Sequence, residues 1–316
     1  MDHLDVKILR WLLQGQTDLP LDPDFRKSYR AIARDLGLDE GMVRYRVKRF
    51  GETGFIPDWH LMANPRLWGG GHAIIWIDVP LSVPRRELFE RLKLVPGVFY
   101  LTRFFGTVVE AYLAYEDEQS VRARAELLGK ISDAKSVKFA RWPFPVCGVA
   151  LSTLDWRLVR SLSESPRRPY IAIAKELGVS SRTVKRRLLR LSRGGAVFAY
   201  PDFNLGALSG SVMASLFVTC QQSRMAEIDR TLSAKLDPYL WHAFHMLSFG
   251  PSDVVPCNYN LLLPNITVAQ ELVRKAQELA GVREARAELV EEIVVLSSTL
   301  EGMTRRMAEL LSVGVG

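Results

Sequence analysis

Long apolar runs and paired cysteines are absent from this sequence, and each absence narrows what the protein can be. No stretch approaches the roughly 18 uncharged apolar residues of a membrane-spanning helix, and residues 1–5 lack the basic and apolar regions of a secretory signal. Cys147, Cys220 and Cys257 form no Cys-x-x-Cys pair, so neither a disulfide framework nor a sulfur-rich zinc site is expected. We therefore expect a cytoplasmic protein with free thiols and no membrane partner.

Motifs typical of catalysis are missing as well. The sequence shows no pattern typical of a nucleophile with its base, and no cluster with metal-ligand spacing. Gly69-Gly70-Gly71 lacks the Lys-Ser/Thr of a phosphate-binding loop and precedes an expected strand, so we interpret it as a flexible linker. The sequence predicts a protein that is not an enzyme and that has no metal site and no cofactor.

The positive charge of the chain is concentrated in one segment. The chain has 316 residues, of which 48% are hydrophobic, which is enough for about two to four domains with apolar cores. Its formal net charge is +7. Residues 151–203 hold 11 basic and 4 acidic groups, an excess equal to that of the whole chain. Such a local excess favours a polyanionic partner.

A twelve-residue pattern occurs twice, and its spacing is typical of a helix-turn-helix. The two copies are Ile32-Ala33-x-x-Leu36-Gly37-x-x-x-x-x-Val43 and Ile173-Ala174-x-x-Leu177-Gly178-x-x-x-x-x-Val184. In each copy the isoleucine and leucine lie on one helical face, and the glycine can take the left-handed conformation that ends a helix. A second helix then begins after a tight turn. The pattern predicts two DNA-binding heads.

Each head has a further helix before the turn and an extended segment after it. The apolar spacing of the first helix is Leu4, Ile8 and Leu12 in one copy and Leu154, Leu158 and Leu162 in the other, with Asp5 and Asp155 at matching positions. The extended segments are Gly54-Phe55-Ile56 and Gly195-Ala196-Val197, which predict short wing strands. In the first head, nine extra residues lengthen the loop at Gln14–Phe25.

The recognition helix of the second head is strongly basic. We expect Ser180 to cap it and Val184, Leu188 and Leu191 to form its buried stripe. From Ser180 to Arg193 it carries six basic residues and no acidic one, which favours a nucleic acid over a solvated surface of mixed charge. A rotation of about 100° per residue points Arg182, Arg186 and Arg193 outward and Arg187 toward the core edge. The DNA-binding residues expected on this helix are Ser181, Arg182, Thr183, Lys185, Arg186, Arg187, Arg190 and Arg193.

The first head is expected to bind DNA more weakly. At the offset of 141 that aligns the two motifs, Arg182 and Arg186 correspond to Gly41 and Tyr45. Asp39 and Glu40 also place acid at the start of the first recognition helix, which repels phosphate. The contacts expected from this helix are Arg44, Tyr45, Lys48 and Arg49. We predict that the second head supplies most of the affinity.

The second part of each half has the order βαββαβ, typical of a ferredoxin-like sandwich. In the first half we expect strands at His72–Val79, Val98–Phe104, Val108–Tyr115 and Val137–Trp142, with helices at Arg85–Leu94 and Val121–Ile131. In the second half we expect strands at Val212–Thr219, Tyr239–Leu247, Tyr259–Leu263 and Glu284–Val295, with helices at Met225–Leu236 and Val268–Ala280. Extra loop residues are expected before Tyr259.

These elements predict an α+β fold of two tandem modules. Winged helix-turn-helix heads at 1–60 and 149–205 alternate with ferredoxin-like domains at 61–148 and 206–297. The last segment, 298–316, is expected to form a C-terminal helix because Leu300, Met303, Met307 and Leu310 have helical spacing.

The chain resembles the Lrp/AsnC (feast/famine) transcription regulators in both halves. The matching residues are Leu4-Asp5, Ile32-Ala33, Leu36-Gly37, Val43, Arg46 and Gly54-Phe55-Ile56, then Leu154-Asp155, Ile173-Ala174, Leu177-Gly178, Val184, Arg187 and Gly195-Ala196-Val197. The resemblance implies that the second helix of each turn enters the major groove of double-stranded DNA. It also implies dimerisation through the βαββαβ domains, as a homodimer or an intramolecular pseudo-dimer, and an amino-acid-like effector. No residue is assigned to an effector site.

Two other functions fit the same resemblance. Siroheme decarboxylases are also built from paired modules of this type, and His242 and His245 would be the candidates for contact with a tetrapyrrole. Their spacing of three on an expected strand places them on opposite faces, so they cannot both line one pocket. An architectural protein that coats DNA is the third alternative. The size of its binding site would distinguish it from a gene-specific regulator.

Overall fold

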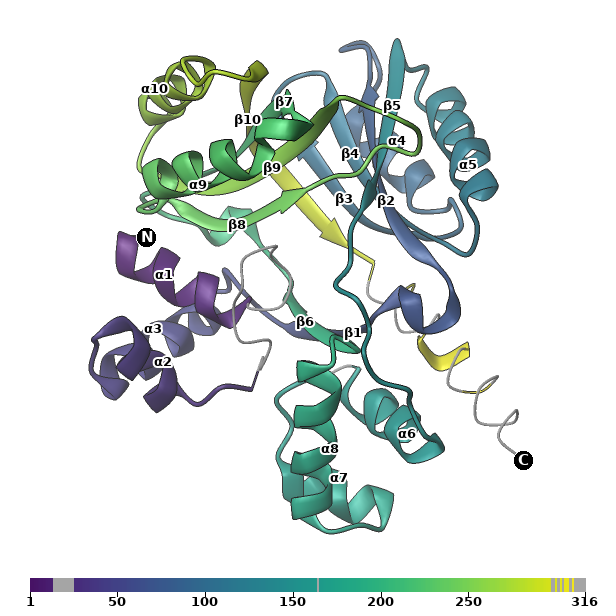
Figure 1. The fold of residues 1–316 in the computed structure, drawn as a ribbon, viewed down its shortest axis with the longest axis vertical. Helices are drawn as coiled ribbons and strands as arrows, with labels where there is room; N and C mark the ends of the chain where they lie inside the picture. Colours follow the sequence, from purple (N-terminus) through teal and green to yellow (C-terminus); the bar gives the residue numbers. More distant parts are fainter. Residues whose placement is uncertain are drawn as a thin grey trace.

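The computed structural model (Figure 1) describes residues 1–13, 26–163, 165–296, 299, 302, 304–306 and 309. Its order of elements is that of an α+β protein with two helical heads and two βαββαβ domains. The predicted loop at Gln14–Phe25 lies outside the described residues, as do the four apolar residues used to predict the C-terminal helix. None of the helices in the described part of the chain is long and apolar enough to cross a membrane.

Each head consists of three helices whose ends follow from the local sequence. The first head contains α1 (His3–Leu12), α2 (Tyr29–Leu36) and α3 (Glu40–Glu52), and the second contains α6 (Thr153–Leu162), α7 (Tyr170–Leu177) and α8 (Ser181–Arg193). Asp2 and Ser152 form capping boxes at the starts of α1 and α6. Gly37 and Gly178 take φ values of 66° and 70° after α2 and α7, which confirms both predicted turns.

The segments that follow the two heads form strands that pair with each other, but the first strand begins later than predicted, because Gly54–Ile56 is a turn and a bend. Strand β1 (Trp59–Ala63) follows the first head and runs antiparallel to β6 (Val197–Pro201), which follows the second, with Leu61 opposite Ala199. The two heads are therefore joined by a two-stranded ribbon beneath the sandwiches (Figure 1). Short 3₁₀ helices, η1 (Pro65–Trp68) and η2 (Leu205–Ala207), follow β1 and β6.

The first sandwich begins at a glycine turn that is ordered. Gly69 ends η1 with a φ of 78°, and Gly71 is the first residue of the strand that follows. A Cβ atom on Gly70 would lie 2.6 Å from the carbonyl oxygen of Tyr115, so only glycine fits beside that strand. The interpretation of the triple glycine as a flexible linker was therefore wrong, because close backbone packing explains these glycines.

Both sandwiches have the predicted order of elements. The first consists of β2 (Gly71–Asp78), α4 (Arg85–Leu92), β3 (Val98–Phe104), β4 (Val108–Tyr115), α5 (Glu118–Ile131) and β5 (Ser136–Trp142). The second consists of β7 (Val212–Gln221), α9 (Met225–Leu236), β8 (Leu240–His245), β9 (Val254–Leu263), α10 (Ile266–Gln277) and β10 (Val282–Val295), with η3 (Gln222–Arg224) before α9. The extra loop residues expected before Tyr259 lie between β8 and β9 and end earlier than predicted, because Val254–Asn258 already pairs with β7.

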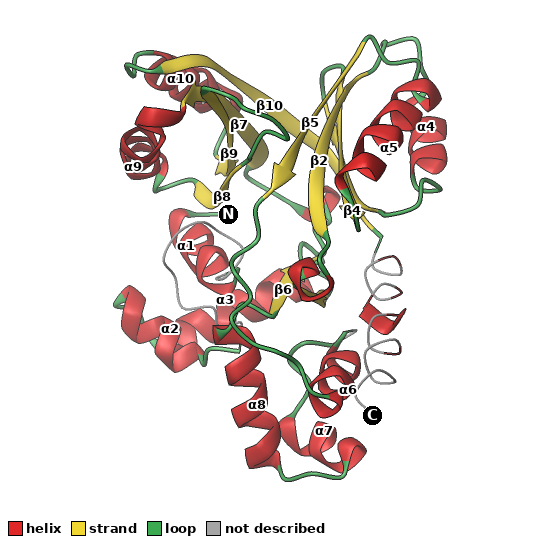
Figure 2. Ribbon diagram, turned by 45° about the vertical axis from the view of Figure 1, so that its right-hand side comes forward, coloured by secondary structure: helices red, strands yellow, loops and turns green. Residues whose placement is uncertain are grey.

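The two sandwiches pair inside one chain. Their strands form an eight-stranded sheet in the order β5-β2-β4-β3-β10-β7-β9-β8, in which Thr102 of β3 lies opposite Ile293 of β10. The outer strands meet again at Arg141 and Leu247, whose backbones exchange hydrogen bonds of 2.7 and 2.9 Å. The helices cover the outer faces and the inner faces look toward each other (Figure 2). The structure thus contains the intramolecular pseudo-dimer.

The first head also packs on the second sandwich. The Arg10 guanidinium on α1 donates to the Asp237 carboxylate at 2.7 Å and to the carbonyl oxygens of Asp237 and Leu240 at the start of β8. Cys220 and Cys257 are buried thiols whose sulfur atoms lie 3.9 Å apart, and Cys147 is half-buried; none of the three forms a disulfide, as the sequence predicts.

Candidate nucleic-acid interface

Helix α8 has the two faces that its sequence predicts. The Ser180 hydroxyl accepts a hydrogen bond from the Thr183 amide at 3.1 Å and so caps the helix. Val184, Leu188 and Leu191 are buried. On the other side, the exposed side chains are Arg182, Lys185, Arg186, Arg190 and Arg193, whereas Ser181, Thr183 and Arg187 are half-buried.

Two of the arginines of α8 bind a buried carboxylate within the same head. Arg187 Nη1 lies 2.9 Å from Asp155 Oδ1, and Arg190 Nη2 lies 2.6 Å from Asp155 Oδ2. Burial alone would raise the pKa of Asp155, but hydrogen bonds from Ser152 and Arg187 and the charge of Arg190 outweigh it and lower that pKa. These two arginines therefore hold α8 against α6. We name this contact the Asp155 clamp.

The other four basic side chains of α8 have no such partner. Among the residues described in the structure, no ion pair or hydrogen bond is found for the side chains of a set that we name the free cations: Arg182, Lys185, Arg186 and Arg193. Unpaired guanidinium and ammonium groups on one exposed helix attract polyanions, because no internal carboxylate offsets their charge. Helix α8 thus presents a basic surface that is open to solvent.

In the first head, by contrast, every basic side chain of α3 is paired. Arg46 and Arg49 each lie 2.7 Å from Asp5, which repeats the Asp155 clamp. Arg44 pairs with Glu40 at 2.7 Å, and Lys48 pairs with Glu52 at 2.8 Å. Tyr45, where the second head has Arg186, is 63% exposed. The two recognition helices therefore differ in free charge far more than in shape.

The sequence did not reveal the role of the two clamps. Arg49, Arg187 and Arg190 were expected to contact DNA, and the structure gives each of them an internal carboxylate. The available signal was the matching of Asp5 and Asp155 in the two copies, since a buried carboxylate requires a cation nearby.

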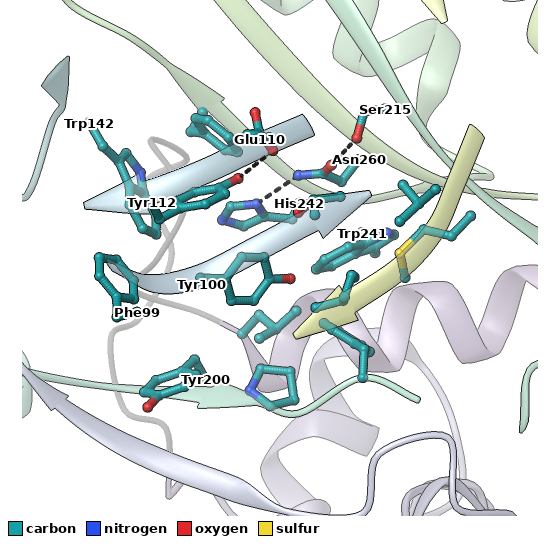
Figure 3. A pocket seen from close by; sticks show the side chains of 18 of the residues that line it. Phe99, Tyr100, Glu110, Tyr112, Trp142, Tyr200, Ser215, Trp241, His242 and Asn260 are labelled. Atoms are coloured by element: carbon teal, nitrogen blue, oxygen red, sulfur yellow. Dashed lines mark hydrogen bonds between the residues drawn. The ribbon is translucent and has the colours of Figure 1, made fainter. Parts of the chain in front are cut away.

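The structure also contains a cavity of about 80 Å³ between the two sandwiches (Figure 3). Its walls come from β3, β4, β5, β7, β8, β9 and β10, together with Met62 of β1 and Tyr200 of β6 in the wing ribbon. Eight of its described lining residues are aromatic: Phe99, Tyr100, Tyr112, Trp142, Tyr200, Phe203, Trp241 and Phe244. No lysine or arginine is found among the described lining residues.

A buried carboxylate lines this cavity. Glu110 on β4 is 2% exposed and accepts hydrogen bonds from Trp76 Nε1 at 2.8 Å and from the Tyr112 hydroxyl at 3.1 Å. Burial raises the pKa of Glu110 to about 7, against the opposing effects of those two donors and of the more distant Arg286. Its hydrogen-bond donors are both neutral side chains.

A polar row on the facing half-sheet lies across the cavity. Asn260 on β9 accepts a hydrogen bond from the Ser215 hydroxyl at 2.8 Å, and its amide nitrogen lies 3.2 Å from His242 Nδ1. In that contact the Asn260 amide donates and His242 Nδ1 accepts, which corresponds to the tautomer that carries its proton on Nε2. His245 lies on the other face of β8 and binds Asp229 at 3.0 Å. The predicted separation of the two histidines is confirmed.

Comparisons with known proteins match the second head most directly. The AsnC-type helix-turn-helix domain family matches residues 151–192. The HTH-type transcriptional regulator Ptr1 of Methanocaldococcus jannaschii is 45% identical over 69 residues, which cover 22% of this chain and 40% of that protein. An HTH-type transcriptional regulator of Pyrococcus furiosus is 38% identical over 96 residues, 29% of this chain and 56% of that protein. The matches thus span about half the length of these relatives.

A solved structure shares the arrangement of the whole chain. The siroheme decarboxylase NirDL, crystallised with an iron-uroporphyrin III analogue, superposes with a TM-score of 0.55 at 15% identity. The superposition covers 98% of this chain and 100% of that one. At this level of identity the similarity concerns only the fold, in which two heads and two sandwiches form one unit.

Proposed function

We propose that the chain is a DNA-binding transcription regulator of the Lrp/AsnC type, in which the second head supplies most of the affinity for double-stranded DNA. The match of that head to the AsnC-type helix-turn-helix family and the similarity to two HTH-type transcriptional regulators support this proposal. The observation that carries this proposal is the set of free cations on α8: Arg182, Lys185, Arg186 and Arg193. Helix α3 offers no equivalent set, because its basic side chains bind carboxylates of the same head.

The two heads therefore have different roles. Phosphate contacts supply the affinity that does not depend on sequence, and they require cationic side chains that are not already bound to carboxylates of the protein. Arg182 and Arg186 lie in the N-terminal half of α8, which is the half of a recognition helix that reaches base edges, and arginine there prefers guanine. The first head then adds reach or a second half-site through Tyr45 and its paired but exposed cations Arg44 and Lys48.

A binding titration with matched variants tests this proposal. Arg182→Ala with Arg186→Ala removes two free cations, and Arg44→Ala with Lys48→Ala removes two exposed cations that are already paired. Duplexes selected from a random pool serve as ligands. We expect the first double variant to lose at least tenfold in affinity and the second to lose less than threefold. Equal losses would contradict the proposed asymmetry.

A second candidate function is that of a tetrapyrrole enzyme, and the superposition on NirDL over 98% of the chain favours it. The cavity argues against it on three counts. A volume of about 80 Å³ is far below the several hundred Å³ of sites for larger ligands. No cation is found among its described lining residues to bind carboxylates, and His242 is the single histidine among them.

Absorbance spectroscopy separates the two candidates. Under the proposed function, incubation with an iron tetrapyrrole leaves the Soret band of the free compound unchanged. A shifted Soret band that titrates to one equivalent, and that is lost in His242→Ala, would support the enzyme instead. A footprint that spreads along the duplex without sequence preference would favour an architectural role in coating DNA.

A further inference from the structure

None of the described residues that line the cavity between the sandwiches belongs to α8. We propose that this cavity binds a compact organic cation, with an ammonium or quaternary ammonium group held between the aromatic walls and the carboxylate of Glu110. The inference stands on the chemistry of the lining, and it does not depend on what the heads bind.

The charge of the lining selects a cation. Glu110 is the single acid among the described lining residues and no base offsets it directly, since its two hydrogen-bond donors are an indole and a phenol. A buried carboxylate without a charged partner is unfavourable, and a bound cation would relieve that cost. An anionic ligand would meet Glu110 with no lysine or arginine lining the described walls to balance it.

The aromatic walls are arranged as a cage. The ring of Tyr112 stands edge-on to Tyr100, with centroids 4.9 Å apart, and to Trp142, with centroids 5.3 Å apart. Rings packed at such angles present π faces in several directions, and those faces attract cations. The Tyr112 hydroxyl donates to Glu110, which enriches the electron density of its ring and strengthens that attraction. Figure 3 shows Tyr112 and Glu110 together on one side of the space, with His242 and Asn260 facing them.

The size and polarity of the cavity restrict which cations can bind. At about 10 to 15 Å³ for each water-sized unit, a volume of about 80 Å³ holds five to eight such units. The indole nitrogen of Trp241, a residue that is 6% exposed and lines the cavity, has no hydrogen-bond partner among the described residues. A ligand that combines a cationic end with one oxygen acceptor suits both features. Choline has this composition, with seven non-hydrogen atoms by its formula, about the size allowed.

Isothermal titration of the full-length protein with two probes tests the inference. Choline carries the cation, and 3,3-dimethylbutan-1-ol has the same shape without the charge. We expect choline to bind at a ratio of one to one and the neutral alcohol to bind at least tenfold more weakly. Equal affinities, or no heat of binding with choline up to roughly 10 mM, would overturn the proposal.

Two variants establish where choline binds. Glu110→Gln keeps the size of the side chain and its hydrogen-bonding oxygen but removes the charge. It should weaken the binding of choline at least tenfold and leave the affinity for the neutral alcohol unchanged. Glu126→Gln, at an exposed position on α5, should leave the affinities for both probes unchanged. Circular dichroism checks that both variants are folded. If Glu110→Gln is folded and still binds choline at full strength, the cavity is not the site.

Discussion

The carboxylate of Asp155 lies 2.6 Å from the guanidinium of Arg190, and the carboxylate of Asp5 lies 2.7 Å from that of Arg49. These two contacts occupy the same place in the two heads. Each uses a buried aspartate on the first helix to hold the recognition helix. The shared clamp explains why both heads have the same shape, while the residues around it decide which head is free to bind a polyanion.

Asp155→Asn should destabilise the second head. The substitution leaves Arg187 and Arg190 without their carboxylate, and breaking a buried pair of this kind costs about 2 to 3 kcal/mol once the partial exposure of the guanidiniums is allowed for. Urea unfolding followed by amide exchange in α6 to α8 measures the loss. Glu176→Gln, which removes a more exposed pair with Arg168, should change stability by less than about 1 kcal/mol.

The same substitution should change the response to acid. Because the pKa of Asp155 is lowered in the folded protein, its contribution is present above the unfolded value of about 3.9 and is lost as the pH falls through the folded value. The difference in unfolding free energy between the wild type and Asp155→Asn should therefore be constant from about pH 6 to 8 and shrink below about pH 4. A difference that grows on acidification would contradict the clamp.

Glu110→Gln should stabilise the sandwiches at alkaline pH. Burial raises the pKa of Glu110 to about 7. The folded protein therefore keeps a proton on this carboxyl group that the unfolded chain releases at about pH 4.5. Stability due to this group is present below that pH and is lost as the pH rises to about 7. We expect the variant to exceed the wild type by about 3 kcal/mol at pH 8 and to match it at pH 5. Urea midpoints at the two pH values measure this, and an identical pH profile would be inconsistent with a buried acid.

Arg10→Ala should loosen the first head from the second sandwich. The substitution removes charge-assisted hydrogen bonds to Asp237 and Leu240, each of which contributes about 1.5 to 3 kcal/mol in favourable cases. Hydrogen exchange should rise in α1 and at the start of β8. Lys7→Ala removes a looser contact with Asp237 at 3.7 Å and should leave exchange nearly unchanged. Equal effects of the two variants would show that the contact does not hold the head.

Local periodicity was sufficient to predict the elements that position the DNA-binding surface. The buried stripe at Val184, Leu188 and Leu191 and the left-handed Gly178 follow from spacing alone, because a helix has one period and its end needs one special conformation. The outward direction of Arg182 and Arg186 follows from the same rotation.

What the sequence could not predict depends on contacts between distant residues. The pairing of Arg190 with Asp155 joins two helices, and the pairing of β1 with β6 joins two heads. Glu110 was placed correctly on a strand, but periodicity cannot reveal that a second half-sheet seals that face from water. The start of β9 was missed because Pro256, which cannot donate a backbone hydrogen bond, lies inside the strand.

The salt dependence of DNA binding tests the central claim most directly. If the four free cations on α8 contact phosphates, the logarithm of the association constant falls with the logarithm of salt concentration at a slope of about −3.6 for the wild type. The account predicts a slope of about −1.8 for Arg182→Ala with Arg186→Ala, and an unchanged slope for Arg44→Ala with Lys48→Ala. Equal slopes for both double variants, or a flat response of the wild type, would contradict it.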